Sequence, residues 1–168
     1  GMNVGIAGLG LIGGSLAKAY KSEPGHTVYG YDIDEAVLGI AQLAGAVDLP
    51  LDRETVGLCD IIFLAVFPRD AALYLKRIAP DISVKTIVFD CCGVKRSVCR
   101  ICFGIAERHG FTFVGGHPMA GNHNSGFKYS RATLFKGAAM ILVPPVYDDV
   151  ELFDRIKRAL EPVGFGHL

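Results

Sequence analysis

Short apolar runs alternate along this chain with longer segments in which apolar residues recur every three or four positions. The apolar runs predict strands over residues 3–7, 26–31, 60–66, 86–89, 111–114 and 138–143. The amphipathic segments predict helices over residues 11–21, 35–44, 70–78, 94–109 and 148–160, with Asp34 and Gly110 as cap residues. Residues 45–57 follow neither period and are expected to be irregular or briefly helical. This order predicts a doubly wound α/β fold with a mainly parallel sheet and helices on both faces.

The length of the chain suits one domain, which we expect to span residues 1–168. Hydrophobic residues make up 51% and charged residues 20%, so the chain can build a complete core and is not expected to be disordered. Gly1 before Met2 is interpreted as the remnant of an expression tag.

The charge balance and the cysteine content narrow the class of protein further. The formal net charge is zero, which gives no reason to expect nucleic acid or an acidic membrane as a partner. No apolar run reaches the roughly 18 residues of a membrane span, and no signal-type stretch is recognised, so we expect a cytoplasmic protein. An odd number of cysteines, five, indicates free thiols. Cys99 and Cys102 share a predicted helix rather than a tight turn, so no metal site is predicted.

A glycine-rich turn follows the first predicted strand and opens the first predicted helix. Its sequence is Gly8-Leu9-Gly10-Leu11-Ile12-Gly13, which fits the G-x-G-x-x-G pattern. The first glycine permits the turn, the second lets the backbone approach a pyrophosphate, and the third lets the helix lie close to the sheet. The phosphates are then expected at the positive end of the helix. The turn predicts a Rossmann-type dinucleotide-binding domain.

The second predicted strand ends at Tyr31 and Asp32, which we assign to the cofactor site. Asp32 stands nineteen residues after Gly13, where a carboxylate can accept hydrogen bonds from the adenosine ribose hydroxyls. It would repel the 2′-phosphate of NADP, and neither Ile33 nor Glu35 is a cation. The predicted cofactor is therefore NAD.

The ends of the third and fourth predicted strands are expected to complete the same crevice. Val66, Phe67 and Pro68 are assigned to the adenosine side, although core packing is an equal alternative for Phe67. Cys91 is assigned to the nicotinamide side.

A loop of Gly115-Gly116-His117-Pro118-Met119-Ala120-Gly121 is expected after the fifth strand. It would place His117 near the reactive ring of the cofactor, where a neutral imidazole can accept a hydroxyl proton while hydride leaves the same carbon. His117 is the predicted catalytic residue.

This loop, together with Ser125-Gly126, Leu134-Phe135-x-Gly137, Pro144 and Asp90-x-x-Gly93-Val94-Lys95, resembles the prephenate dehydrogenase family. The likeness runs from Asn3 to about Pro162. It implies NAD-dependent oxidative decarboxylation of prephenate to 4-hydroxyphenylpyruvate in tyrosine biosynthesis, with His117 as the catalytic histidine. It also implies a helical C-terminal domain that forms a homodimer and is missing from this chain.

The resemblance has two departures, and both concern expected substrate-binding residues. Gly93 stands where the family often has serine, and Asn122-His123 stand where it often has Thr-Glu. His123 and Lys95 can attract a substrate carboxylate or can be solvated surface residues. The substrate therefore stays open between prephenate and arogenate. A related β-hydroxyacid or imine dehydrogenase and a non-catalytic NAD-sensing module are the further alternatives.

Overall fold

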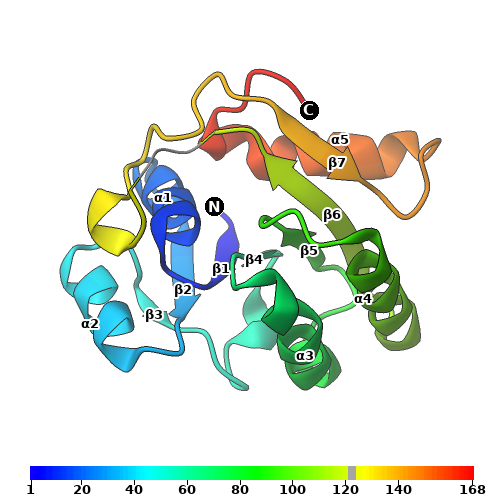
Figure 1. The fold of residues 1–168 in the computed structure, drawn as a ribbon, viewed down its shortest axis with the longest axis horizontal. Coiled ribbons are helices and arrows are strands. Elements are labelled where there is room, and N and C mark those ends of the chain that lie inside the picture. Colours follow the sequence, from blue (N-terminus) through cyan, green and yellow to red (C-terminus); the bar gives the residue numbers. More distant parts are fainter. Residues whose placement is uncertain (121–123) are drawn as a thin grey trace.

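The computed structural model describes residues 1–120 and 124–168, which form a sheet flanked by helices (Figure 1). The strands of the described residues are β1 (Asn3–Ala7), β2 (Thr27–Tyr31), β3 (Leu49–Pro50), β4 (Ile61–Leu64), β5 (Ile87–Asp90), β6 (Thr112–Pro118) and β7 (Met140–Val143). Their order is β3-β2-β1-β4-β5-β6-β7, and neighbours are parallel except for antiparallel β6 and β7. The α-helices are α1 (Leu11–Lys21), α2 (Glu35–Leu43), α3 (Pro68–Ile78), α4 (Arg96–His109) and α5 (Val150–Leu160). The predicted doubly wound, Rossmann-type α/β fold is confirmed.

The helices divide between the two faces of the sheet and create two hydrophobic cores. One core contains buried residues of α1, α2 and α5, and the other contains buried residues of α3 and α4. Side chains along a strand alternate between them, so Ile61 and Phe63 of β4 join the first core while Ile62 and Leu64 join the second. All four are buried. This two-sided burial explains why the central strands are continuously apolar.

Two helix boundaries follow from the cap residues that the sequence indicates. The side chain of Asp34 accepts a hydrogen bond from the Ala36 N–H at 3.0 Å and begins α2. Gly110 ends α4 in the left-handed conformation with φ 82°. Both predictions are confirmed.

The structure corrects the predicted strands in two places. β6 continues through Pro118, so Gly115, Gly116 and His117 belong to a strand rather than to the expected loop. Antiparallel pairing with β7, in which His117 lies opposite Ile141, extends it. The expected irregular stretch after α2 contains β3, a two-residue strand that pairs with β2. Neither pairing is visible in a local hydrophobic period, because the partners are distant in sequence.

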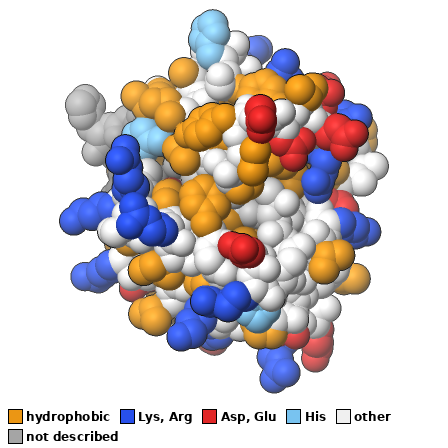
Figure 2. Space-filling view, turned by 90° about the vertical axis from the view of Figure 1, so that its right-hand side faces the viewer, with side chains coloured by type: hydrophobic (Ala, Val, Ile, Leu, Met, Phe, Trp, Pro, Cys, Tyr) orange, Lys and Arg blue, Asp and Glu red, His pale blue; other side chains and the backbone are white. Residues whose placement is uncertain are grey.

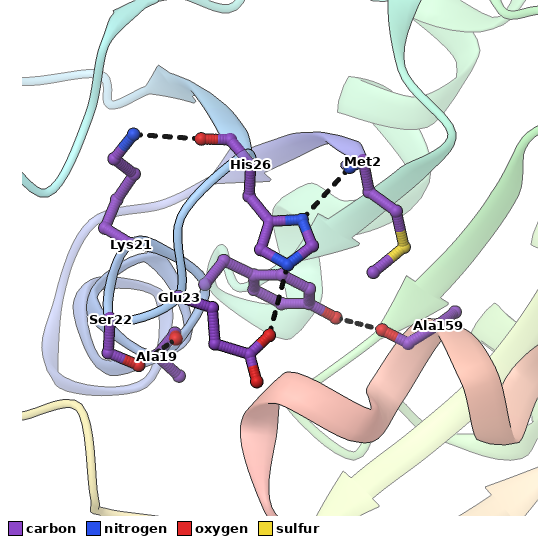
Figure 3. Close-up of polar contacts among 8 residues, drawn as sticks. Met2, Ala19, Lys21, Ser22, Glu23, His26 and Ala159 are labelled. Atoms are coloured by element: carbon purple, nitrogen blue, oxygen red, sulfur yellow. Dashed lines mark hydrogen bonds and ion pairs between the residues drawn. The ribbon is translucent and has the colours of Figure 1, made fainter.

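Polar contacts tie the end of α1 to the rest of the domain (Figure 3). The hydroxyl of Tyr20 donates to the carbonyl of Ala159 at the end of α5. Nδ1 of His26 accepts a hydrogen bond from the Met2 N–H at 3.0 Å, which leaves Nε2 as the donor to Glu23 at 3.2 Å. Burial raises the pKa of Tyr20 well above its ordinary value. The Tyr20 hydrogen bond thus links the last turn of α1 to α5, and the glycine-rich turn is attached to the other end of α1.

One side of the molecule leaves apolar side chains uncovered. Figure 2 shows hydrophobic side chains gathered on the side where α4, α5 and β7 lie in Figure 1, with charged side chains of both signs around them. The exposed residues of β7 and the following turn include Ile141, Val143, Val146 and Tyr147. Within residues 1–120 and 124–168, every helix is too short or too polar to cross a lipid bilayer.

Candidate active site

A cavity of about 840 Å³ lies at the carboxyl ends of β1, β2 and β4. Parallel α/β sheets bind their ligands at this edge. Ten of the residues assigned to the cofactor from the sequence line it: Gly8, Leu9, Gly10, Leu11, Ile12, Tyr31, Asp32, Val66, Phe67 and Pro68. Its volume falls within the range of small-molecule and cofactor pockets.

The glycine-rich turn has the geometry that a pyrophosphate requires. Gly8 has φ 93°, and a Cβ there would lie 2.3 Å from the carbonyl oxygen of Ala65. A Cβ on Gly13 would lie 1.7 Å from the carbonyl oxygen of Gly8, so α1 starts close against the turn. Around Gly10, by contrast, there is open space. Gly13 therefore shapes the turn without lining the cavity.

The first turn of α1 is suited to an anion. Gly10 is its N-cap residue and provides no side-chain hydrogen bond, and the first turn contains no acidic residue. Backbone N–H groups at this position have no intrahelical partners, and the helix dipole favours negative charge beside them. The residues present therefore fit the diphosphate of a dinucleotide.

The carboxylate of Asp32 is held at the end of β2 by the backbone. Its Oδ2 accepts a hydrogen bond from the Leu9 N–H at 2.8 Å, and its Oδ1 accepts one from the Asp34 N–H at 2.9 Å. Each carboxylate oxygen can accept a further bond. Asp32 thus links the glycine-rich turn to the position where ribose hydroxyls are expected.

Helix α3 supplies a wall of the cavity that the sequence reasoning missed. Tyr31 and Tyr74 stack with ring centroids 5.0 Å apart, and the guanidinium carbon of Arg77 lies 5.1 Å from the Tyr74 centroid. The α3 residues of this wall follow the spacing i, i+3, i+4, i+7, namely Asp70, Leu73, Tyr74 and Arg77. One helical face produces that spacing. The period was therefore present in the sequence, but only the fold shows that this face meets the cavity.

The turn between β5 and α4 contacts both the cavity and His117 of β6. Cys92 lines the cavity, and the next residue, Gly93, lies against the His117 ring. The carboxylate of Asp90 orders this turn by accepting hydrogen bonds from the N–H groups of Cys92 at 3.1 Å and Val94 at 2.9 Å. Burial raises the pKa of Asp90, and these backbone hydrogen bonds oppose the shift. His117 is exposed, so a ligand can reach it, but it is not part of the cavity wall.

Of two neighbouring cysteines, the one assigned to the cofactor site is buried and the other lines the cavity. Cys91 is 1% exposed and packs in the core that contains α1, so it does not line the cavity; its neighbour Cys92 does. Successive side chains of an extended chain point to opposite sides, which accounts for the difference. Burial raises the pKa of Cys92 to about 12, so the thiol is neutral near pH 7. The described residues contain no group of three side chains suited to a metal ion.

The remaining predicted residues have different positions. Lys95 is the exposed N-cap residue of α4 and, like Gly93, is not part of the cavity wall. Asn122 and His123 lie outside the described residues. Ser125 and Gly126 line the cavity although the sequence reasoning used them only as part of the family likeness.

Comparisons with known proteins agree with this geometry. Residues 16–166 match the family model described as prephenate dehydrogenase, nucleotide-binding domain. The prephenate dehydrogenase of Bacillus subtilis (strain 168) is 31% identical over 160 residues, which cover 93% of this chain and 43% of that protein. The chain spans about half the length, or less, of the curated relatives named prephenate dehydrogenase that it matches.

Two solved structures are similar over nearly the whole chain. The arogenate dehydrogenase of Synechocystis has a TM-score of 0.88 at 30% identity, covering 99% of this chain and 59% of that one. The prephenate dehydrogenase of A. aeolicus, solved with hydroxyphenyl propionate and NAD+, has a TM-score of 0.82 at 31% identity, covering 100% and 59%.

Proposed function

Because the chain belongs to the prephenate dehydrogenase family, we propose that the protein oxidises and decarboxylates prephenate to 4-hydroxyphenylpyruvate with NAD+. The observation that carries the proposal is the position of His117, which abuts the turn whose Cys92 lines the predicted cofactor cavity. A dinucleotide seated on the glycine-rich turn and extending toward Cys92 would bring its reactive ring toward this histidine.

Different residues of the cavity bind different parts of the cofactor. The N–H groups at the start of α1 bind the diphosphate, and Asp32 accepts hydrogen bonds from the ribose. The carboxylate of Asp32 also disfavours a 2′-phosphate, which supports NAD over NADP. When bound, NAD+ supplies the hydride acceptor.

His117 acts on the ring hydroxyl of the substrate. Its imidazole accepts a hydrogen bond from that hydroxyl and so assists loss of hydride from the carbon that bears it. Departure of carbon dioxide from the opposite ring carbon then makes the ring aromatic, and the hydroxyl keeps its proton in the product. The protein therefore has mainly to position the substrate and polarise one hydroxyl group. Lys95, Gly93, Asn122 and His123 are proposed to border the substrate.

Arogenate is a second candidate substrate, favoured by the likeness to the Synechocystis arogenate dehydrogenase. Arogenate carries the same ring and hydroxyl, so the roles of Asp32 and His117 are unchanged. The two candidates differ only in the side chain that the substrate presents away from the reacting carbon.

We also propose an oligomeric state and a cellular location for the protein. We expect a cytoplasmic homodimer formed through a helical domain outside residues 1–168, with no nucleic-acid or membrane partner. The exposed apolar residues on the side of β7 support packing against a further protein surface. Light scattering on the full gene product tests the dimer; a monomer at working concentration contradicts it.

NADH formation by the full gene product tests the reaction. Absorbance at the NADH band is followed after NAD+ is mixed with prephenate or with arogenate. NADH with prephenate supports the main proposal, and NADH with arogenate alone replaces the substrate but keeps the roles of the residues. NAD+ binding without NADH from either substrate contradicts the proposed reaction.

A further inference from the structure

The outer face of α1 carries contacts that the proposed function does not use. Gly14, Ser15 and Lys18 lie on this helix beyond the glycine-rich turn and meet the segment of residues 125–131, which follows the described end of β6 by a few residues. Figure 1 shows this segment, coloured yellow, beside α1. We call residues 125–131 the anchored segment.

The fit between Gly14 and the anchored segment is tight. A Cβ on Gly14 would lie 2.8 Å from Cδ1 of Phe127 and 2.8 Å from Oγ of Ser130. Contacts this short do not occur for real Cβ atoms, so a larger residue at position 14 forces the side chains of Phe127 and Ser130 to shift. The absence of a side chain at Gly14 is therefore what allows the close approach.

Two polar contacts hold the segment in the same place. Nζ of Lys18 donates to the carbonyl of Ser130 at 2.8 Å and lies 4.6 Å from the ring centroid of Phe127. The hydroxyl of Ser15, which is 1% exposed, accepts a hydrogen bond from the Arg131 N–H at 3.0 Å. Side chains one turn apart on α1 thus bind the peptide group between Ser130 and Arg131, and the contact of Lys18 with the Phe127 ring reaches the start of the turn.

The start of the anchored segment reaches the cavity. Ser125 and Gly126 line it together with Gly10, Leu11 and Ile12. One helix therefore contributes twice to the expected diphosphate side of the cavity, through its own first turn and through the anchored segment that it holds. Asp32 and Ile33, the two residues after β2, and Leu73 of α3 line the cavity on the expected adenosine side.

We propose that Gly14 and Lys18 are positioning residues for the cofactor: they seat Ser125 and Gly126 over the diphosphate and so set the affinity for NAD+ without touching it. This inference rests on the proposed function, because NAD+ is its ligand. The inference predicts different effects on the two halves of the dinucleotide. Loss of the anchor weakens binding of the diphosphate and leaves binding of the adenosine half unchanged.

Two variants with matched controls test the inference by calorimetry. Gly14→Ala places a Cβ against the side chains of Phe127 and Ser130, and Lys18→Met removes the hydrogen bond to Ser130 while keeping the aliphatic stem. The controls are Gly39→Ala, a helical glycine with open space around its added Cβ, and Lys76→Met on α3. We expect the dissociation constant for NAD+ to rise about tenfold, a loss of about 1.4 kcal/mol, in both test variants and in neither control. Adenosine, which lacks the diphosphate, binds all five proteins equally.

The outcomes are distinct. Unchanged NAD+ affinity in folded Gly14→Ala and Lys18→Met overturns the inference. A loss of adenosine affinity equal to the loss of NAD+ affinity also overturns it, because it would indicate general loosening of the domain. If Gly14→Ala does not fold, Lys18→Met decides alone. If the parent protein does not bind NAD+, the proposed function itself is wrong. If the parent binds NAD+ and the test variants bind it equally well, only the inference about Gly14 and Lys18 is wrong.

Discussion

The imidazole ring of His117 occupies the space in which a side chain at Gly93 would begin. A Cβ on Gly93 would lie 2.2 Å from Nδ1 of His117. The Gly93 N–H also donates to the carbonyl of Gly116 at 3.3 Å, which holds the β5–α4 turn against β6. The serine that the family often has at this position therefore cannot accompany this placement of the ring. Here the backbone of Gly93, rather than a serine side chain, lies against the ring.

Gly93→Ser should displace the His117 ring and lower kcat while NAD+ affinity stays unchanged. The new Cβ meets the ring, and φ 63° at this position costs a further 1–3 kcal/mol or so of backbone strain. Gly45→Ser is the matched control, because Gly45 has φ 77° but no atom within 4 Å of its added Cβ. Steady-state kinetics and NAD+ titration measure the two effects. Equal kcat in both variants contradicts the steric relationship.

His117→Asn should abolish most NADH formation and leave cofactor binding intact. General acid–base assistance of this kind contributes about 10²- to 10⁴-fold to a rate, and the exposed ring supports little of the core. His109→Asn at the end of α4 is the control. Full activity in His117→Asn would remove the histidine from the reaction and favour a different dehydrogenase or an NAD sensor.

Asp32→Ser should weaken NAD+ binding by about tenfold or more and reduce the discrimination against NADP+. A hydrogen bond to a charged group contributes about 1.5–3 kcal/mol, and the substitution also removes the charge that repels a 2′-phosphate. Asp34→Ser is the control, since serine caps a helix about as well as aspartate. The ratio of the two dissociation constants, by fluorescence titration, is the readout. The same ratio in parent and Asp32→Ser contradicts the assignment of Asp32 to the ribose.

The stability of the fold should fall between about pH 9 and 12 because of buried thiols. Burial raises the pKa of Cys59 from 9.0 to about 12. The native state therefore keeps its proton where the unfolded chain has lost it, so the stabilisation is complete below pH 9 and is lost as pH rises toward 12. Urea midpoints across this range measure the slope for the parent and for Cys59→Ala. The variant should show a flatter slope even though the cavity lowers its absolute stability. An identical slope contradicts the shift.

Local signals in the sequence were sufficient for much of the fold. The bounds of β1 and α1 were predicted without error, because an apolar run, a glycine-rich turn and an amphipathic period follow one another within residues 3–21. The same local chemistry placed Asp34 and Gly110 at helix ends. These features depend on neighbours in the chain, so composition and spacing determine them.

Features that depend on distant partners were decided by the tertiary structure. Pairing with β7 makes His117 a strand residue of β6. Cys91 faces the core, so Cys92 lines the cavity instead. The position of α3 brings the guanidinium of Arg77 over the ring of Tyr31. The close approach of Gly93 to His117 joins residues 24 positions apart, and that of Gly14 to Phe127 joins residues 113 positions apart. The sequence by itself determined the α-helices, the strands other than β3 and the cofactor chemistry that they carry. Packing alone decided which of their faces meet, because a local period specifies an apolar face but not its partner.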